Sequence, residues 1–177
     1  MDYIPGRTLE QAWPTMTDEQ KTTVSEELHG YLMQIRNLKG MYIGGHNHGT
    51  ASVGKHIPHQ GGPFASEKLF NEFLFSEIID TVPEVPHYYA KNSFRDDHKI
   101  VSTQGDLAPR NITVDDDCLV SAILDCEMGG WYPAWWEHFK FYYVVHQVKK
   151  WEPYVSTILP PEFSTEFCAM FYLYCLR

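Results

Sequence analysis

The segment Lys99–Asp125, with the sequence KIVSTQGDLAPRNITVDDDCLVSAILD, contains three short runs rich in β-branched residues. These runs, at 99–102, 111–114 and 119–124, predict strands because β-branched side chains fit extended, pleated backbone. The three consecutive aspartates at 115–117 predict a turn that joins the second and third strands as a hairpin. The polar residues of the segment are therefore expected at strand ends and in the loop between the first two strands.

Three of these polar residues suit phosphoryl transfer. Asp106 and Asn111 are five positions apart in the first loop, and Asp125 closes the last strand. A carboxylate can orient an acceptor hydroxyl and take its proton, while an amide oxygen and a second carboxylate can bind the metal that bridges the phosphates. We therefore expect Asp106 as the base and Asn111 and Asp125 as Mg²⁺ ligands. The alternative is structural: an Asx-type turn at Asp106 and Asn111, and a cap at Asp125.

The remainder of the chain predicts helices. Residues 17–40 begin with a capping box at Thr17, continue with apolar residues at helical spacing, and stop at Gly40. Ser66 can cap a second helix, and Pro133 suits the first turn of a third. The three further helices are expected at 66–80, at 133–150 and from 160 onward. This order predicts a single α+β domain over residues 1–177, mainly helical with a small hairpin sheet.

The segment 44–63 contains six glycines, four histidines and two prolines, so we expect a long loop without a regular element. The spacing of the histidines is H-x-H and H-x-x-H, which suits Zn²⁺ or Cu²⁺, although no carboxylate or cysteine lies nearby. A solvated polar loop is the alternative. The histidines concerned are His46, His48, His56 and His59.

The composition limits the classes of partner. The chain has 177 residues and a formal charge of −9, which would repel nucleic-acid phosphates and anionic lipid. Its aromatic fraction of 15% favours a packed globular domain over a disordered chain. No apolar run approaches the roughly 20 residues of a membrane span, and no secretory signal precedes the first helix. We expect a cytoplasmic protein that acts on a small molecule, without nucleic-acid or membrane partners.

Aromatic residues crowd the sequence after Asp125, where Trp131, Tyr132, Trp135 and Trp136 fall within six positions. Such residues line pockets and also fill cores. Helical spacing favours a core position for Trp136. The substrate pocket is expected to include Gln104, Arg110, Trp131 and Tyr132.

Four segments resemble the fungal aminoglycoside phosphotransferase and choline kinase-like family, whose catalytic lobe has the protein-kinase-like fold. Asp2–Leu9 is similar to the hinge between the two lobes of that family, and Gly105–Asn111 to its catalytic loop. Asp125–Pro133 is similar to its metal-binding Asp and the Gly-Trp-Tyr-Pro stretch after it, and Gly62–Phe64 matches a further segment. The resemblance covers most of the chain.

The resemblance implies a role for each residue of the catalytic loop. Asp106 is then the catalytic base, Asn111 and Asp125 hold Mg²⁺, and Glu127 adds a second carboxylate for the metal or the acceptor. Two residues depart from the family pattern: Gln104 stands where the family has a His that braces the loop, and Cys126 replaces a Trp. Gln can form hydrogen bonds but cannot carry a charge.

A further departure concerns the ATP-binding lobe, which precedes the hinge in this family. Residues 1–9 are expected to be a remnant of that hinge, with no ATP lobe upstream, so ATP binding by this chain alone should be weak. The face that the lobe would occupy is then open to a second copy of the chain or to a partner chain. Three functions remain open at this point: a phosphotransferase, an ATP-independent isomerase, dehydratase or cyclase that uses Asp106 or Glu127 as acid or base, and a non-catalytic binding protein.

Overall fold

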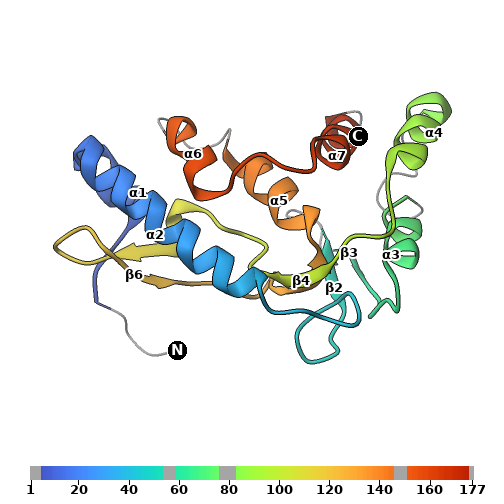
Figure 1. Cartoon of the computed structure of the whole chain (residues 1–177), viewed down its shortest axis with the longest axis horizontal. Helices are drawn as coiled ribbons and strands as arrows, with labels where there is room; N and C mark the ends of the chain where they lie inside the picture. The colour runs from blue at the N-terminus through green and yellow to red at the C-terminus, as the bar shows by residue number, and fades with distance from the viewer. Residues whose placement is uncertain (1–4, 54–58, 76–82, 146–150, 176–177) are drawn as a thin grey trace.

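The computed structural model describes residues 5–53, 59–75, 83–145 and 151–175, and it is an α+β structure with small antiparallel sheets (Figure 1). The α-helices are α1 (Leu9–Ala12), α2 (Asp18–Arg36), α3 (Glu67–Phe73), α4 (Glu84–Ser93), α5 (Trp135–Val145), α6 (Glu152–Ile158) and α7 (Ser164–Cys175). The 3₁₀ helices are η1 (Trp13–Thr15) and η3 (Pro109–Asn111). The strands are β1 (Arg7–Thr8), β2 (Ala51–Val53), β3 (His59–Gly61), β4 (Ile100–Thr103), β5 (Ile112–Val114), β6 (Val120–Ile123) and β7 (Gly130–Pro133).

The predicted hairpin is confirmed as β5 and β6, which pair antiparallel. Its turn is held by Asp115, whose Oδ1 accepts hydrogen bonds from the N–H groups of Asp117 at 3.0 Å and Leu119 at 2.9 Å. Such a side-chain bond stands in for a backbone turn, which is why aspartate is common at this position. The hairpin therefore follows from local sequence.

Strand β1 adds the hinge-like segment to the edge of this sheet, in the order β1-β5-β6. Arg7 and Thr8 pair with Val114 and Thr113 of β5. Gly6, just before β1, has a φ of 129°, and a Cβ at this position would lie 2.5 Å from the Val114 carbonyl oxygen. Only glycine fits so close to the neighbouring strand. Residues 1–4 of the expected hinge lie outside the described part of the chain.

Helix α2 begins as predicted, with the Thr17 side chain accepting from Gln20 N and the Gln20 side chain accepting from Thr17 N. Its predicted end at Gly40 is wrong, because the helix stops at Arg36 and the chain then pairs with β4. Ser102 N donates to Leu38 O at 3.2 Å, and Gly40 N donates to Ile100 O at 3.1 Å. Sheet pairing thus replaces the last helical turn.

The predicted long loop at 44–63 is also corrected, because it contains β2 and β3, which pair antiparallel. Ala51 and Val53 are buried on one face of β2, and that burial stabilises a strand in glycine-rich sequence.

Pro133 is the last residue of β7, not the first turn of α5. Ser66 caps α3 as predicted, accepting from Leu69 N, but residues 76–82 of the expected helix lie outside the described ranges.

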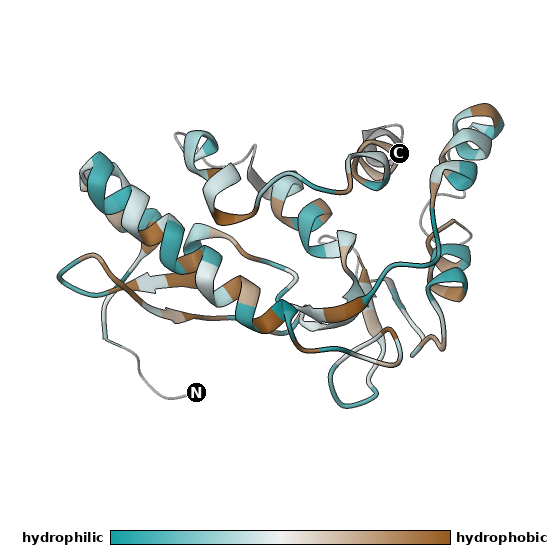
Figure 2. Cartoon of the chain, in the orientation of Figure 1, coloured by the Kyte–Doolittle hydropathy of each residue, from teal (hydrophilic) through white to brown (hydrophobic). Residues whose placement is uncertain are grey.

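Two groups of buried apolar side chains form the core. The first packs α1, α2 and α6 against β5, and the second packs α3, α5 and α7 against β2 and β7. The largest buried side chains of the two groups are Trp151 and Phe141 in the first, and Trp135, Trp136, Tyr132 and Phe70 in the second. In Figure 2, hydrophilic and hydrophobic residues alternate along α2, as expected of a helix with one buried side. Among the helices of the described residues, none is long and apolar enough to cross a membrane.

Candidate functional site

The buried side chain of Gln104 holds the loop between β4 and β5 in place. Its Oε1 accepts from Asp106 N at 2.7 Å, and its Nε2 donates to the carbonyl oxygens of Asp125 at 3.1 Å and Leu124 at 3.3 Å. The side-chain amide therefore ties the backbone at Asp106 to the backbone at Asp125. An amide can do this because it both accepts and donates, so the loop needs no charged residue at this position. Gln104 was expected in the substrate pocket, but its side chain is buried, with 3% of its surface exposed, and holds the loop from inside the protein.

A buried carboxylate, Glu137 of α5, holds the same loop from the core. Its oxygens accept from Gln104 N at 2.6 Å and from Gly105 N at 3.3 Å. Burial raises the pKa of the Glu137 carboxyl, and the Gln104 N–H, the Arg36 charge and the Gly105 N–H oppose that rise. Gly105 has a φ of 84°, and a Cβ there would lie 2.5 Å from the Met128 carbonyl oxygen. The path of the loop is thus set by backbone contacts that a side chain at 105 would break.

The Asp106 carboxylate lies at the surface end of this loop, with 16% of the side chain exposed. Its Oδ2 accepts from Asn111 Nδ2 at 3.1 Å and forms an ion pair with the Arg110 guanidinium. Asn111 Nδ2 also donates to the Asp106 carbonyl oxygen at 2.9 Å. Because both bonds use the amide nitrogen, they leave Asn111 Oδ1 without a hydrogen-bond donor among the described residues. A fixed carboxylate and a free amide oxygen are thus brought side by side.

Backbone pairing brings Asp125 close to Asn111. Leu124 N donates to Asn111 O at 2.7 Å, and Asp125 is the next residue. Asp125 is exposed and has a φ of 57°, in the left-handed region that a non-glycine residue seldom adopts. Such strained positions concentrate at functional sites. Glu127 is also exposed, in the turn between β6 and β7. The part of the chain that the structure describes has no cluster of three His, Cys, Asp or Glu side chains placed to hold a metal.

The two aromatic residues expected in the pocket have different environments. Tyr132 is in the core, where its hydroxyl accepts from Ser52 N at 2.9 Å and its ring stacks on Trp136, so we remove it from the candidate pocket. Trp131 is partly exposed on β7 and packs edge-on against His46 at 5.1 Å between ring centroids. Trp136 is buried, as its helical spacing predicts.

The histidines of the segment 44–63 have individual partners where the structure describes them. His46 Nε2 lies 3.0 Å from Ser102 Oγ, and the His48 ring stacks on Tyr42 at 4.2 Å between centroids. His56 and the side chain of His59 lie outside the described residues. The metal hypothesis for these histidines therefore gains no support from His46 and His48.

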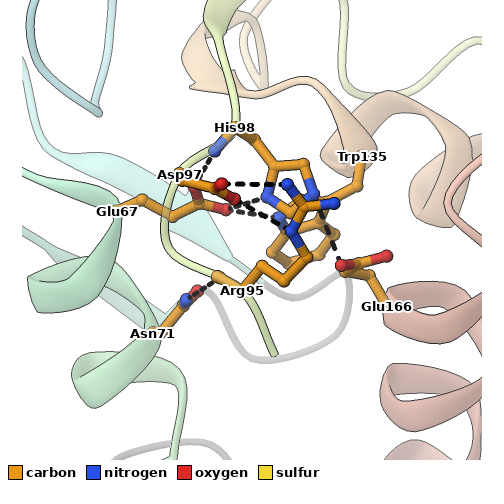
Figure 3. Close-up of polar contacts among 7 residues, drawn as sticks. All are labelled: Glu67, Asn71, Arg95, Asp97, His98, Trp135 and Glu166. Atoms are coloured by element: carbon orange, nitrogen blue, oxygen red, sulfur yellow. Dashed lines mark hydrogen bonds and ion pairs between the residues drawn. The ribbon is translucent and has the colours of Figure 1, made fainter. Parts of the chain in front are cut away.

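A second polar cluster, which the sequence analysis did not find, surrounds His98 (Figure 3). Its ring lies between two buried carboxylates, with Nδ1 2.8 Å from Glu67 Oε1 and Nε2 3.3 Å from Glu166 Oε1. Ionised carboxylates only accept hydrogen bonds, so the ring donates to both only as the imidazolium. Trp135 Nε1 also donates to Glu67 Oε1, at 2.8 Å. The cluster joins α3, α5 and α7 to the segment before β4, and only tertiary structure brings these residues together.

Comparison with known proteins finds no match, either among protein-family models or among curated proteins. The resemblance of the loop to the kinase-like family therefore rests on its amino-acid sequence alone. In the structure, hydrogen bonds join Gln104 to Asp106 and Asp125, and Asn111 to Asp106.

Proposed function

We propose that this chain carries the acceptor-activating and metal-binding half of a small-molecule phosphotransferase, with the kinase-like catalytic lobe that its loop resembles. The observation that supports this most is the Gln104 bridge, which joins the backbones of Asp106 and Asp125 while Asn111 binds Asp106. The result is a carboxylate, an amide oxygen and a second carboxylate on neighbouring strand ends. Phosphoryl transfer needs this combination of groups.

Asp106 is the base of this proposal. Its Oδ2 is held by Asn111 and Arg110, which fixes the carboxylate plane and leaves Oδ1 to accept the proton of an acceptor hydroxyl. The partial exposure of the side chain lets a substrate hydroxyl reach it. Arg110, which is 39% exposed, also places a positive charge where an anionic donor group would approach.

The donor set fits a hard cation such as Mg²⁺. Asn111 Oδ1 and the exposed Asp125 carboxylate are oxygen ligands, and Mg²⁺ typically uses one or two carboxylates together with water and substrate phosphates. When bound, the ion would neutralise charge on the phosphates. Glu127, which is exposed two residues after Asp125, is the second carboxylate of the proposal, for the metal or the acceptor.

Metal binding tests the proposal without requiring turnover. Mn²⁺, a spectroscopic substitute for Mg²⁺, is titrated into the full chain with and without ATP, and free Mn²⁺ is measured by electron paramagnetic resonance. We expect Asp125→Asn to weaken binding at least tenfold and added Mg²⁺ to compete. Asp116→Asn, in the exposed hairpin turn, is the matched control and should bind as wild type. Equal binding by the two variants would overturn the metal assignment.

The role of Asp106 is tested by phosphoryl transfer from ATP to a panel of small alcohols and amino alcohols. Asp106→Asn should lower the rate by about 10²–10⁴-fold, the range that general-base catalysis supplies, while Asp116→Asn leaves it unchanged. The alternative outcome is that the wild-type chain converts a small molecule without nucleotide and that Asp106→Asn abolishes this conversion. The chain then performs acid-base chemistry without ATP. In that case the phosphotransferase assignment is wrong.

A further inference from the structure

A cavity of about 330 Å³ lies between the C-terminal end of α2, strand β4, the start of α5 and the segment 159–163. Its lining contains none of the residues of the Asp106 site. Figure 1 shows α2 running toward β4 at this end of the molecule. The residues that line the cavity are His29, Met33, Arg36, Lys39, Lys99, Val101, Ala134, His138, Leu159, Pro160, Glu162 and Phe163.

The charge of this cavity is opposite to that of the whole chain. Arg36, Lys39 and Lys99 line it together with a single acidic residue, Glu162, although the chain carries a formal charge of −9. Within the described residues, no carboxylate lies within 4.0 Å of any of the three cations. Three cations against one lining carboxylate give the cavity an excess of positive charge, which raises the local concentration of anions.

Arg36 is the innermost of the three cations. Its Nη2 donates to the Ala134 carbonyl oxygen at 2.9 Å, but its buried Nη1 has no hydrogen-bond partner among the described residues. Burial lowers the pKa of Arg36, and the charges of Glu137 and Glu162 oppose that shift. A buried guanidinium N–H without an acceptor is unfavourable, and an oxygen of a bound anion would supply the missing acceptor. Guanidinium groups bind carboxylates and phosphates well because their donors match two oxygens at once.

The lining also contains four apolar side chains, those of Met33, Val101, Leu159 and Phe163. His138 lies beside Arg36, and burial together with the Arg36 charge lowers the pKa of His138 to about 4. The neutral ring adds an uncharged polar edge. The volume is at the lower end of the range for small-molecule sites, roughly 300–1,000 Å³. A ligand that matches the cationic and the apolar side chains of the lining therefore has an anionic head and a small apolar body.

We infer that this cavity is a binding site for a small organic anion, a carboxylate or phosphate monoester, whose oxygens contact Arg36, Lys39 and Lys99 and whose apolar part packs on Met33 and Phe163. Lys39 and Lys99 are exposed and can turn toward the ligand. Lys39 Nζ donates to the Arg36 carbonyl oxygen at 2.8 Å, an exposed bond that solvent can replace. The site is separate from the Asp106 loop and holds whether or not that loop transfers phosphate.

Binding of three probes by isothermal titration calorimetry on the full chain tests this inference. Benzoate and phenyl phosphate supply the two anionic heads on one apolar ring, and benzyl alcohol is the neutral analogue. We expect at least one anion to bind with a Kd in the low millimolar range or below and at least tenfold more tightly than benzyl alcohol. The stronger of the two anions identifies carboxylate or phosphate as the natural head group. Equal binding of benzyl alcohol, or no binding of either anion at 10 mM, would overturn the inference.

Variants separate the site from non-specific charge. Lys39→Gln with Lys99→Gln should raise the Kd at least tenfold, and Arg36→Gln should abolish binding. Lys68→Gln, on the exposed side of α3, is the control and should bind as wild type. Because Arg36→Gln also removes a bond to Ala134 and can affect folding, the lysine double variant decides the test. Unchanged affinity in the double variant would refute the assignment.

Discussion

The buried hydrogen bonds of Gln104 predict that one substitution at this position strongly lowers the stability of the protein. Gln104→Ala removes the hydrogen bond from Asp106 N and those to the carbonyls of Leu124 and Asp125, inside a site where the side chain is 3% exposed. Each such bond contributes a net 0.5–1.5 kcal/mol, so we expect a loss of about 2–4 kcal/mol in the free energy of unfolding. The Asp106 amide also loses its acceptor. Its hydrogen exchange should therefore accelerate more than that of the neighbouring hairpin.

Urea denaturation followed by tryptophan fluorescence measures this loss, with the slope m as a check that unfolding still exposes the same surface. Gln34→Ala is the matched control, because Gln34 is exposed on α2 and makes one 3.2 Å bond to its own helix. It should change stability by no more than about 0.5 kcal/mol. Gln104→His, which restores the residue usual in the resembling family, can still accept from Asp106 and donate to one carbonyl, so about half the stability should return. If Gln104→Ala lowers the free energy of unfolding by less than about 1 kcal/mol at unchanged m, the stabilising role of Gln104 is refuted.

Three further predictions concern the residues that support the site. His98→Ala leaves two buried carboxylates without their shared partner and should cost about 3–5 kcal/mol, measured by urea denaturation. Asp97→Asn, at an exposed ion pair, is the control and should keep a urea midpoint close to that of the wild type. The pKa of His138 is lowered from 6.5 to about 4 in the folded chain. At a pH between these two values, the unfolded chain therefore binds a proton on His138 that the folded chain does not. The contribution of His138 should therefore lower the free energy of unfolding by about 2 kcal/mol between pH 7 and pH 5. In His138→Gln this part of the pH dependence should be absent. Gly105→Ala should cost about 2–4 kcal/mol and weaken Mn²⁺ binding, since its Cβ would meet the Met128 carbonyl oxygen at a φ of 84°; wild-type stability would contradict this.

Local signals in the sequence predicted the elements whose stabilising contacts lie within a few residues. The capping box at Thr17 and the Asx turn at Asp115 are both present, and the strand pair around that turn follows. Helix ends and short strands were less predictable. Gly40 does not end α2, because sheet contacts with β4 compete with the last helical turn. Strands β1, β2, β3 and β7 contain no run of β-branched residues, so no local pattern predicts them, and they are held by pairing with other strands.

The loop residues Asp106, Asn111 and Asp125 could be selected from the sequence, because their chemical types and their order between strands suit one reaction. What the sequence could not decide was the direction of each side chain. Gln104 and Tyr132 were both expected in a pocket, yet contacts from residues up to 80 positions away bury them below the surface.

By itself, then, the sequence determined the α+β class and the loop with its three oxygen-bearing residues, since these depend on neighbours along the chain. The tertiary structure alone decided which amide links Asp106 to Asp125, which carboxylate holds that loop from the core, and where His98 meets its two carboxylates. It also decided that three cations share one cavity. The physical reason is that burial and pairing depend on contacts between distant segments, and no local pattern records which distant residue will supply the partner.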